Sequence, residues 1–226
     1  MNKVLTSKWT KVAVFLACLI PFGMLLWRVL NPVLHGLPFD TDLTANPIEF
    51  LTHRTGDWTL RFLVITLAVT PLRKLLRMPQ LIRFRRMLGL FAFFYGFLHF
   101  GIWIGIDKFF DWADMWKDVH KRPFITVGFT AFVLLIPLAI TSTSGMIRRL
   151  GGKRWQLLHR LIYVIAVLGV IHYYWLVKSD VRKPLEYAFL VGILLAWRLG
   201  AWLIGRRQQA VPSAVKRPER TSAESA

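Results

Sequence analysis

The stretch LLHRLIYVIAVLGVIHYYWLV, residues 157–177, decides the fold of this chain. Apart from His159, Arg160 and His172, it consists almost entirely of aliphatic and aromatic residues. A helix of about 20 such residues spans the hydrocarbon core of a bilayer, which is about 30 Å thick. A helix on the surface of a soluble domain would instead show a polar face. The stretch therefore predicts a transmembrane helix with a histidine near each end.

Five more apolar stretches of similar length accompany it. Hydrophobic residues make up 55% of the 226 residues, and the mean hydropathy is +0.45. Only closed barrels place strands in lipid, and the alternation of polar and apolar residues that they need is absent. The sequence therefore predicts an all-α fold, a six-helix transmembrane bundle with spans at 12–30, 58–76, 87–106, 124–142, 157–177 and 185–204.

Basic residues lie mostly on one side of the predicted spans. The net charge is +18, and eighteen of the thirty Lys and Arg residues fall on the side that holds both termini, whereas ten of the twelve acids fall on the other. Cytoplasmic loops of membrane proteins are enriched in Lys and Arg. Both termini are therefore predicted to be cytoplasmic, and nucleic-acid binding is not needed to explain the charge. Four arginines near span ends are expected to reach the interface: Arg28, Arg61, Arg160 and Arg198.

Three histidines, His99, His159 and His172, lie within apolar segments. A buried imidazole is costly unless something binds it, so these positions indicate a proton relay, a substrate path or a metal centre. The single cysteine, Cys18, excludes disulfides, Cys-ligated zinc and iron–sulfur clusters within the chain. The third and fifth predicted spans run in the same direction, so His99 and His172 are expected at similar depth. We interpret this pair as the axial ligands of a b-type haem.

His159 is expected at a different level, nearer the cytoplasm. It precedes His172 by thirteen residues, a rise of about 20 Å, which is too long for both to bind one iron. On an ideal helix the two side chains also lie roughly 140° apart. Helix tilt, a distortion near Gly169 or different rotamers would let both face the bundle interior, and the sequence leaves these three open. The spacing predicts two stacked redox sites, or one haem and a second centre, with His159 as a further candidate metal ligand.

A second haem with two histidine ligands lacks one of them. The positions thirteen and fourteen residues before His99 are Arg86 and Arg85, and arginine cannot ligate iron. Arginine does bind carboxylates and phosphates through paired hydrogen bonds. We therefore expect haem propionates or a flavin phosphate to be held on the inner side by Arg86, Arg154 and Arg160, with Arg122 and Lys178 in the same role on the outer side.

The outer loops carry the other histidines, His35, His53 and His120, to which we assign ordinary surface roles. One outer segment, 107–121, is rich in Trp, Phe and Asp. Its aromatic residues fit the belt of aromatic side chains found at membrane interfaces. They also fit a docking surface for an outer partner, which is the role that we predict.

Several motifs, taken together, resemble the MsrQ (YedZ) family, the haem-binding membrane subunits of the bacterial periplasmic methionine sulfoxide reductase system. The resemblance extends over nearly the whole chain. More distantly, the chain resembles the ferric reductase-like transmembrane domain, which carries two histidines on each of two helices, one more than this chain provides. The motifs are NPIE (46–49) with TG (55–56), VTPL (69–72), LIRFRRMLGL (81–90) leading to LH (98–99), RPFITVG (122–128), TST (141–143), WQLLH (155–159) and IHY (171–173).

The resemblance implies a membrane cytochrome b that passes electrons from the quinone pool, or from a cytosolic flavin reductase, to a periplasmic molybdenum-containing methionine sulfoxide reductase. It implies haem b and FMN as cofactors, His99, His159 and His172 as haem-associated residues, and a multi-pass location in the bacterial inner membrane. Residues 1–207 then form a ferric reductase-like transmembrane haem domain, and 208–226 form a disordered cytoplasmic tail. No catalytic site for the final substrate is expected in this chain.

Two other functions stay open. A self-contained transmembrane ferric or cupric reductase would reduce a small substrate on the outer side without a partner. A transporter would use the histidines as proton relays and would hold no cofactor. The apolar segments lack the acidic residues that commonly accompany such relays, which disfavours the transporter.

Overall fold

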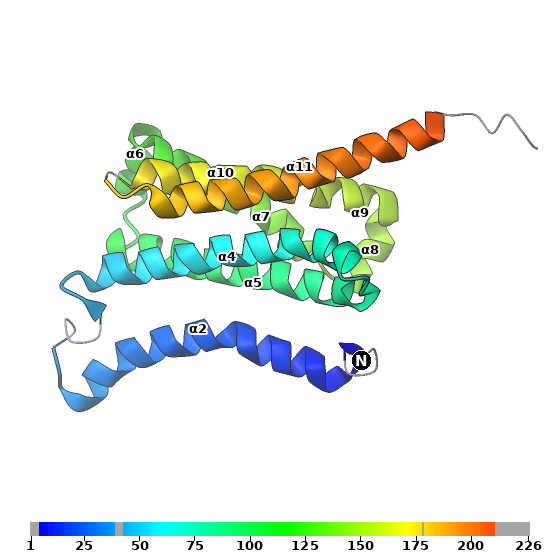
Figure 1. Cartoon of the computed structure of the whole chain (residues 1–226). Helices are drawn as coiled ribbons and strands as arrows, with labels where there is room; N and C mark the ends of the chain where they lie inside the picture. Colours follow the sequence, from blue (N-terminus) through cyan, green and yellow to red (C-terminus); the bar gives the residue numbers. More distant parts are fainter. Residues whose placement is uncertain (1–4, 39–42, 178, 211–226) are drawn as a thin grey trace, which may run out of the picture.

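The computed structural model describes residues 5–38, 43–177 and 179–210, and every regular element within them is a helix. The all-α prediction is therefore confirmed. Figure 1 shows the long helices lying side by side. The elements are α2 (Lys8–His35), α4 (Pro47–Leu75), the 3₁₀-helix η1 (Pro79–Leu81), α5 (Ile82–Ile102), the π-helix η2 (Trp103–Asp107), α6 (Trp112–Lys121), α7 (Pro123–Ile140), α8 (Ser144–Leu150), α9 (Gly152–His159), α10 (Leu161–Leu176) and α11 (Arg182–Ala210).

Five helical segments of the described residues are long and apolar enough to cross a membrane. They contain five of the six predicted spans, with small shifts at the ends. The sixth predicted span, 58–76, falls in α4, which begins eleven residues earlier, at Pro47. The sixth crossing and the cytoplasmic termini stay predictions. The five segments are Lys8–His35, Pro79–Asp107, Pro123–Ile140, Gly152–Leu176 and Arg182–Arg206.

The predicted tail begins inside a helix. α11 continues to Ala210, so it includes the first three residues of the segment 208–226. Residues 211–226 lie outside the described part of the chain, and the disordered tail stays a prediction.

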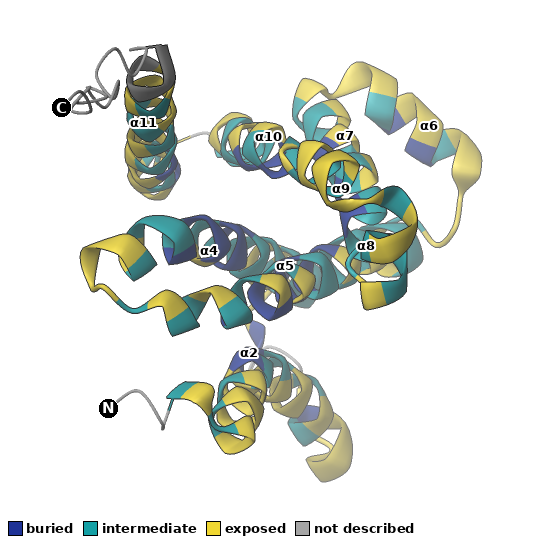
Figure 2. Cartoon of the chain, turned by 90° about the vertical axis from the view of Figure 1, so that its right-hand side faces the viewer, coloured by how far each residue is buried: buried dark blue, intermediate teal, exposed yellow. Residues whose placement is uncertain are grey.

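The core lies where α4 and α5 meet α7 and α10. Leu67, Ala92 and Ala166 are fully buried there, and small residues such as alanine let helix backbones approach closely in lipid. Phe62 of α4 stacks on Tyr95 of α5, with ring centroids 5.3 Å apart and ring planes at 10°. By contrast, α2 and α11 expose much of their surface (Figure 2), as expected for helices whose outer faces contact lipid.

The hydroxyl of Tyr95 also fixes α2. That helix is visibly bent (Figure 1) and contains Pro21, which lacks an N–H and crowds the preceding turn. Tyr95 donates to the carbonyl of Cys18 (2.8 Å) and accepts from the amide of Phe22 (3.1 Å). It therefore replaces the bond that these two backbone groups would form in a straight helix. Leaving either group unpaired would cost about 1–3 kcal/mol.

At the inner end of α11, Arg198 ties the helix to the bundle. It donates to the hydroxyl of Tyr163 (2.6 Å) and to the carbonyl of Leu67 (3.0 Å). That carbonyl lies four residues before Pro71, which has no N–H to offer it. The proline in α4 thus leaves a free acceptor, and an arginine from another helix fills it.

Towards the outer end of α11, Tyr187 makes a similar connection to α4. Its hydroxyl donates to Asp57 (2.8 Å) and lies 3.2 Å from Nε of Arg61. Arg61 and Arg198, two of the arginines expected to reach the interface, therefore each bond to a neighbouring helix. A donor at this depth is stabilised more by a protein acceptor than by lipid.

Candidate functional site

His99 of α5 and His172 of α10 lie next to each other. Their ring centroids are 6.0 Å apart and their planes are at 80°. Two metal–nitrogen bonds of about 2 Å each, together with the two ring radii, account for such a separation. The structure therefore brings together the pair that the sequence predicted, at a distance that suits ligands on opposite sides of one metal atom.

Backbone carbonyls set the tautomer of both rings. Nδ1 of His99 lies 2.9 Å from the carbonyl oxygen of Thr52, and Nδ1 of His172 lies 2.7 Å from that of Phe124. A carbonyl only accepts, so each Nδ1 carries the proton and donates it. Each Nε2 then keeps a free lone pair, the arrangement usual for histidines that ligate a metal.

Two glycines make room for these rings. A Cβ on Gly128 of α7 would lie 2.5 Å from Nδ1 of His172, and one on Gly56 of α4 would lie 3.1 Å from Nδ1 of His99. Each imidazole therefore contacts a helix backbone closely, at a position that only glycine leaves open. The sequence alone did not indicate that these glycines make room for the histidines, although both belong to the quoted motifs TG (55–56) and RPFITVG (122–128).

A cavity of about 540 Å³ surrounds the histidine pair. We call it the outer cavity, because it lies toward the side of the bundle that the sequence predicts to face outward. Its volume is within the usual range of small-molecule and cofactor sites. Its walls include Gly96 and Gly169, each three residues before one of the two histidines. Apolar residues of α4, α5, α7 and α10 line most of the rest. Within the described residues no three His, Cys, Asp or Glu side chains gather as a metal site. Two imidazoles in an apolar slot fit a flat macrocycle that brings its own four ligands.

The mouth of the outer cavity is polar, and Arg122 is the basic residue in its lining. This fits the predicted role of Arg122 toward acidic groups of a ligand. Lys178, predicted for the same role, lies outside the described residues. His53 also lines the mouth, and it lies in α4 instead of a loop. The other lining residues at the mouth include Asn46, Glu49 and Asp107.

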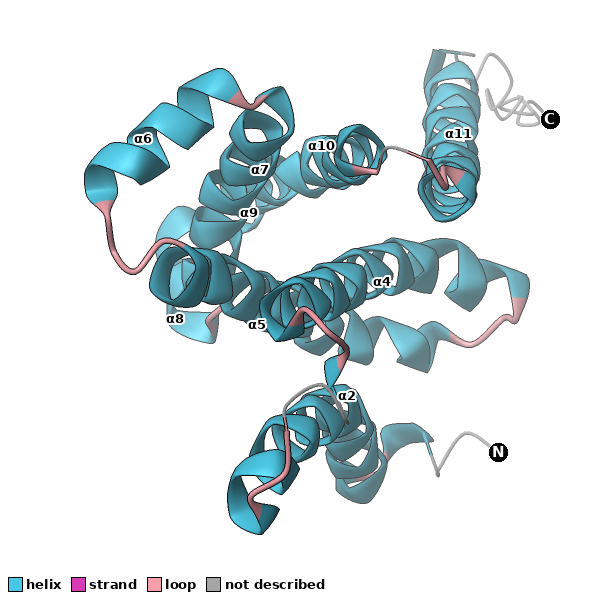
Figure 3. Ribbon diagram, turned by 90° about the vertical axis from the view of Figure 1, so that its left-hand side faces the viewer, coloured by secondary structure: helices cyan, strands magenta, loops and turns pink. Residues whose placement is uncertain are grey.

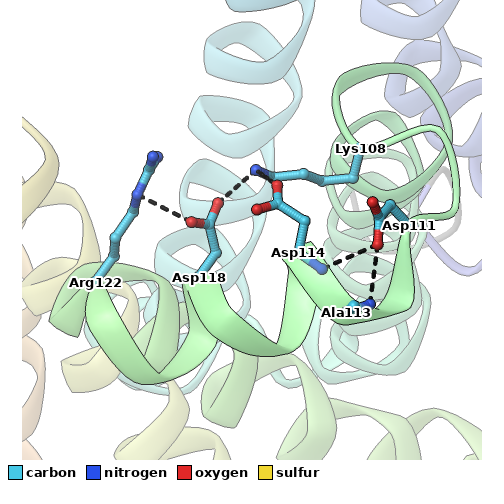
Figure 4. A network of polar contacts seen from close by, with 6 residues as sticks. All are labelled: Lys108, Asp111, Ala113, Asp114, Asp118 and Arg122. Atoms are coloured by element: carbon cyan, nitrogen blue, oxygen red, sulfur yellow. Dashed lines mark hydrogen bonds and ion pairs between the residues drawn. The ribbon is translucent and has the colours of Figure 1, made fainter.

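Arg122 belongs to a network that fixes α6 (Figure 4). Its Nε lies 3.2 Å from Asp118, and Lys108 bridges Asp118 and Asp114, each at 2.6 Å. The hydrogen bond from Asp114, followed by that from Asp118, raises the pKa of Lys108, and the hydrogen bond from Lys108 lowers the pKa of Asp114. Most of the predicted docking segment, 107–121, is therefore a helix, which lies across the end of the bundle (Figure 3).

His159 lies away from the pair, in a second cavity of about 390 Å³. Its Nδ1 is 3.0 Å from the carbonyl of Trp155, whose ring stacks on the imidazole at 3.9 Å. Nε2 lies 3.4 Å from Oγ of Ser142. That hydroxyl donates its proton to the carbonyl of Leu138 (2.6 Å). The carbonyl of Leu138 also faces the imidazole, so His159, unlike His99 and His172, has two backbone carbonyls near its ring.

Three arginines line this inner cavity, Arg85, Arg86 and Arg160. The lining contains no carboxylate among the described residues, so the cavity favours an anionic ligand. Arg86 and Arg160 were predicted for this role. Arg154, also predicted, is exposed and does not line either cavity described here. Arg85 cannot ligate iron, and only the tertiary structure shows that it lines the inner cavity.

The helical stretch 157–177 is interrupted once, at Arg160. There α9 ends at His159 and α10 begins at Leu161, within the apolar helical segment Gly152–Leu176. At Arg160 the bonds tighten, with its amide donating to the carbonyl of Leu157 and Tyr163 donating back to its own carbonyl. Of the three possibilities that the sequence leaves open, a distortion is therefore present, and it lies at Arg160 instead of near Gly169.

Asp57 is a polar residue of the outer cavity, although it lies one residue before the predicted span 58–76. It lies ten residues inside α4, beside Gly56. A helix-start signal was present in the sequence: Asn46 caps the helix by accepting from the amide of Glu49 (3.2 Å), and Pro47 occupies the first helical position. The apolar span was read without its polar first turns, and Asp57 was placed outside it.

Comparison with known proteins agrees with these features. A family model described as "Ferric reductase like transmembrane component" matches residues 55–170. The match includes His99 and His159 and ends two residues before His172. With the five apolar helices, it supports a multi-pass membrane protein.

Close relatives share one name, "Protein-methionine-sulfoxide reductase heme-binding subunit MsrQ". The chain is 57% identical over 195 residues to the protein of Herminiimonas arsenicoxydans, covering 85% of both chains. It is 52% identical over 204 residues to that of Rhodospirillum rubrum, covering 90% of this chain and 93% of the relative. With the protein of Caulobacter vibrioides it shares 50% identity over 186 residues, 82% of this chain and 84% of the relative.

Proposed function

This chain belongs to the MsrQ family of protein-methionine-sulfoxide reductase subunits, and we propose that it is a membrane cytochrome b that carries electrons through the bilayer. The electrons come from the quinone pool or a cytosolic flavin reductase. They leave to a periplasmic molybdenum-containing methionine sulfoxide reductase, which repairs oxidised periplasmic proteins. The chain crosses the bacterial inner membrane six times, with both termini cytoplasmic, and it holds no catalytic site for the final substrate.

The pairing of His99 with His172 is the observation that carries this proposal. Both rings present an unprotonated Nε2, and their centroids are 6.0 Å apart. His99 and His172 would hold haem b between them, and the haem would supply one-electron transfer. The carbonyls of Thr52 and Phe124 hold the rings in the ligating tautomer. Gly56 and Gly128 keep each ring against its helix.

The inner cavity is the proposed site of a second, anionic cofactor. Its arginines, Arg85, Arg86 and Arg160, are suited to propionates or to the phosphate of FMN. His159 offers one ligating nitrogen, and Trp155 supplies an aromatic face. FMN is implied by the family resemblance. Arg154, predicted for the same role, does not line this cavity.

A reduced-minus-oxidised spectrum of the purified chain, with pyridine haemochrome quantification per polypeptide, tests the proposal. We expect at least one haem b for each chain, with the spectrum of a six-coordinate low-spin iron. Colourless protein recovered in a folded state from haem-replete cells would contradict the proposed function.

The family description "Ferric reductase like transmembrane component" keeps one rival function in view, a self-contained ferric or cupric reductase. Such an enzyme would reduce these metal ions steadily when the purified chain is given only quinol. An electron-transfer subunit would instead need its periplasmic partner for sustained turnover.

A further inference from the structure

A polar cluster formed by Asp57, Arg61 and Tyr187 has no part in the proposed function so far. Arg61 Nη2 lies 2.7 Å from Asp57 Oδ2, and the hydroxyl of Tyr187 donates to Asp57 Oδ1 (2.8 Å). Nε of Arg61 lies 3.2 Å from the same hydroxyl. Ionisable groups at membrane depth are costly and usually have a function. The cluster therefore requires an explanation beyond packing.

The cluster lies between the outer cavity and the lipid-facing surface. Asp57 lines that cavity, as does Tyr173, whose ring contacts Tyr187 at 6.1 Å. On the other side, the side chain of Arg61 is 40% exposed, whereas that of Asp57 is 11% exposed. A ligand that arrives through lipid would thus contact Arg61 first. Bound at the cluster, it would be separated from the histidine pair by a single layer of residues.

The level of the cluster in the bundle matches that of the histidines. Gly56, next to Asp57, contacts His99. Tyr173, next to His172, contacts Tyr187, which lies five residues into α11, about 7.5 Å from the start of the helix. A group bound at the cluster therefore lies within the outer half of the bundle and close to the electron-carrying site.

The chemistry of the cluster favours a neutral ring with hydroxyl groups. Asp57 already neutralises Arg61, so an anionic lipid phosphate would find no net positive charge here, and the Asp57 carboxylate keeps acceptor capacity for a hydroxyl group. The aromatic rings of Trp58, Tyr173 and Tyr187 surround these polar atoms, with the Arg61 guanidinium 4.6 Å from the Trp58 ring. Aromatic faces with a few hydrogen-bonding groups are the features that bind a small aromatic head group.

We propose that Asp57, Arg61 and Tyr187 form a lipid-accessible binding site for the head group of a membrane quinol. This inference rests on the proposed function, in which the quinone pool is one electron source. Oxidation of one quinol to quinone breaks two O–H bonds and releases two electrons and two protons. The electrons go one at a time to the one-electron carrier in the outer cavity, and the protons leave in turn through the Asp57 carboxylate to water on the outer side.

Binding of decylubiquinone to the purified chain in phosphatidylcholine nanodiscs tests the site directly, without turnover. We expect saturable binding, measured by flow dialysis, that weakens about tenfold or more in Asp57→Asn and Tyr187→Phe. Tyr174→Phe is the matched control, because Tyr174 is an exposed tyrosine of α10 outside the cluster, and it should bind like the unmodified chain. Decylubiquinol should also reduce the haem more slowly in the two cluster variants, whereas dithionite should reduce it fully in all proteins.

The cluster could also serve only to join α4 to α11, and the same variants separate the two roles. If Asp57→Asn and Tyr187→Phe melt earlier but bind decylubiquinone as the unmodified chain does, the inference is wrong. It is equally wrong if the unmodified chain binds no decylubiquinone while keeping its haem spectrum. In both cases the proposed function survives, because only loss of the haem spectrum itself contradicts that function.

Discussion

The outer cavity contains the facing pair His99 and His172, whereas the inner cavity contains one histidine and three arginines. The same elements supply both: α5 carries His99 at one end and Arg85 and Arg86 at the other, and the α9–α10 segment carries His172 and His159. In the outer cavity each histidine Nδ1 donates to one backbone carbonyl and Nε2 is left free, whereas His159 lies near two backbone carbonyls, those of Trp155 and Leu138.

The difference lies in what opposes the imidazole. In the outer cavity a second neutral imidazole stands 6.0 Å away, which suits a metal held from two sides. In the inner cavity the groups facing the ligand are permanent cations, which suit carboxylates or phosphates. The same two segments, α5 and α9–α10, therefore form a site suited to a metal at one end of the bundle and a site suited to an anion at the other. The difference is that α5 places a histidine in the first site and arginines in the second.

The largest effect is expected from removing an outer ligand. His99→Ala or His172→Ala should abolish or greatly reduce the Soret band of the purified chain, because a single imidazole leaves one axial position empty. His120→Ala, on the exposed surface of α6, is the control and should leave the spectrum unchanged. An unaltered spectrum in both ligand variants would end the assignment of this pair.

Gly128→Ala should have the next largest effect, on the outer cavity alone. Its Cβ would lie 2.5 Å from Nδ1 of His172, so the ring or the helix must shift at a cost of about 1–3 kcal/mol. We expect haem retention to fall roughly tenfold, measured by haemochrome per chain. Gly23→Ala has nothing within 4 Å of its added Cβ and should retain haem fully. Equal retention in the two variants would show that the close contact at Gly128 is unimportant.

His159→Ala sharpens the comparison by acting on the inner cavity. The outer haem spectrum should persist, while electron entry or the content of a second cofactor falls, measured by flavin and haem quantification per chain. If this variant alone removes all haem, the proposed pairing is wrong and His159 is an axial ligand of the haem.

The smallest effect concerns the network that holds α6 at the outer mouth. The pKa of Asp114 is lowered below its ordinary value of 3.8, chiefly by the hydrogen bond from Lys108. The pair therefore stabilises the fold fully above that value, and its contribution is lost as the pH falls through the lowered pKa. The loss should be small, because exposed ion pairs are screened by solvent. Melting temperatures of the unmodified chain and Asp114→Asn should differ near neutral pH and converge in acid; a constant difference would contradict this account.

The sequence by itself determined the helical class and the apolar segments, because the cost of exposing backbone groups to lipid leaves few alternatives to a helix. It also determined which histidines lie within those segments. The pairing of His99 with His172 followed from chain direction and depth alone, and the structure places these two rings together. The sequence was less informative about where helices begin and end. The first turns of α4 are polar, so the predicted apolar span did not include Asp57.

Only the tertiary structure decided how the side chains are presented. The break at Arg160 comes from local bonding that residue types do not reveal. The carbonyls of Thr52 and Phe124, which fix the histidine tautomers, are backbone groups that any residue carries. Such contacts join positions 47 and 48 residues apart in sequence. These contacts depend on how each helix is rotated about its axis and shifted along its neighbour. The hydropathy of the sequence does not determine either of these.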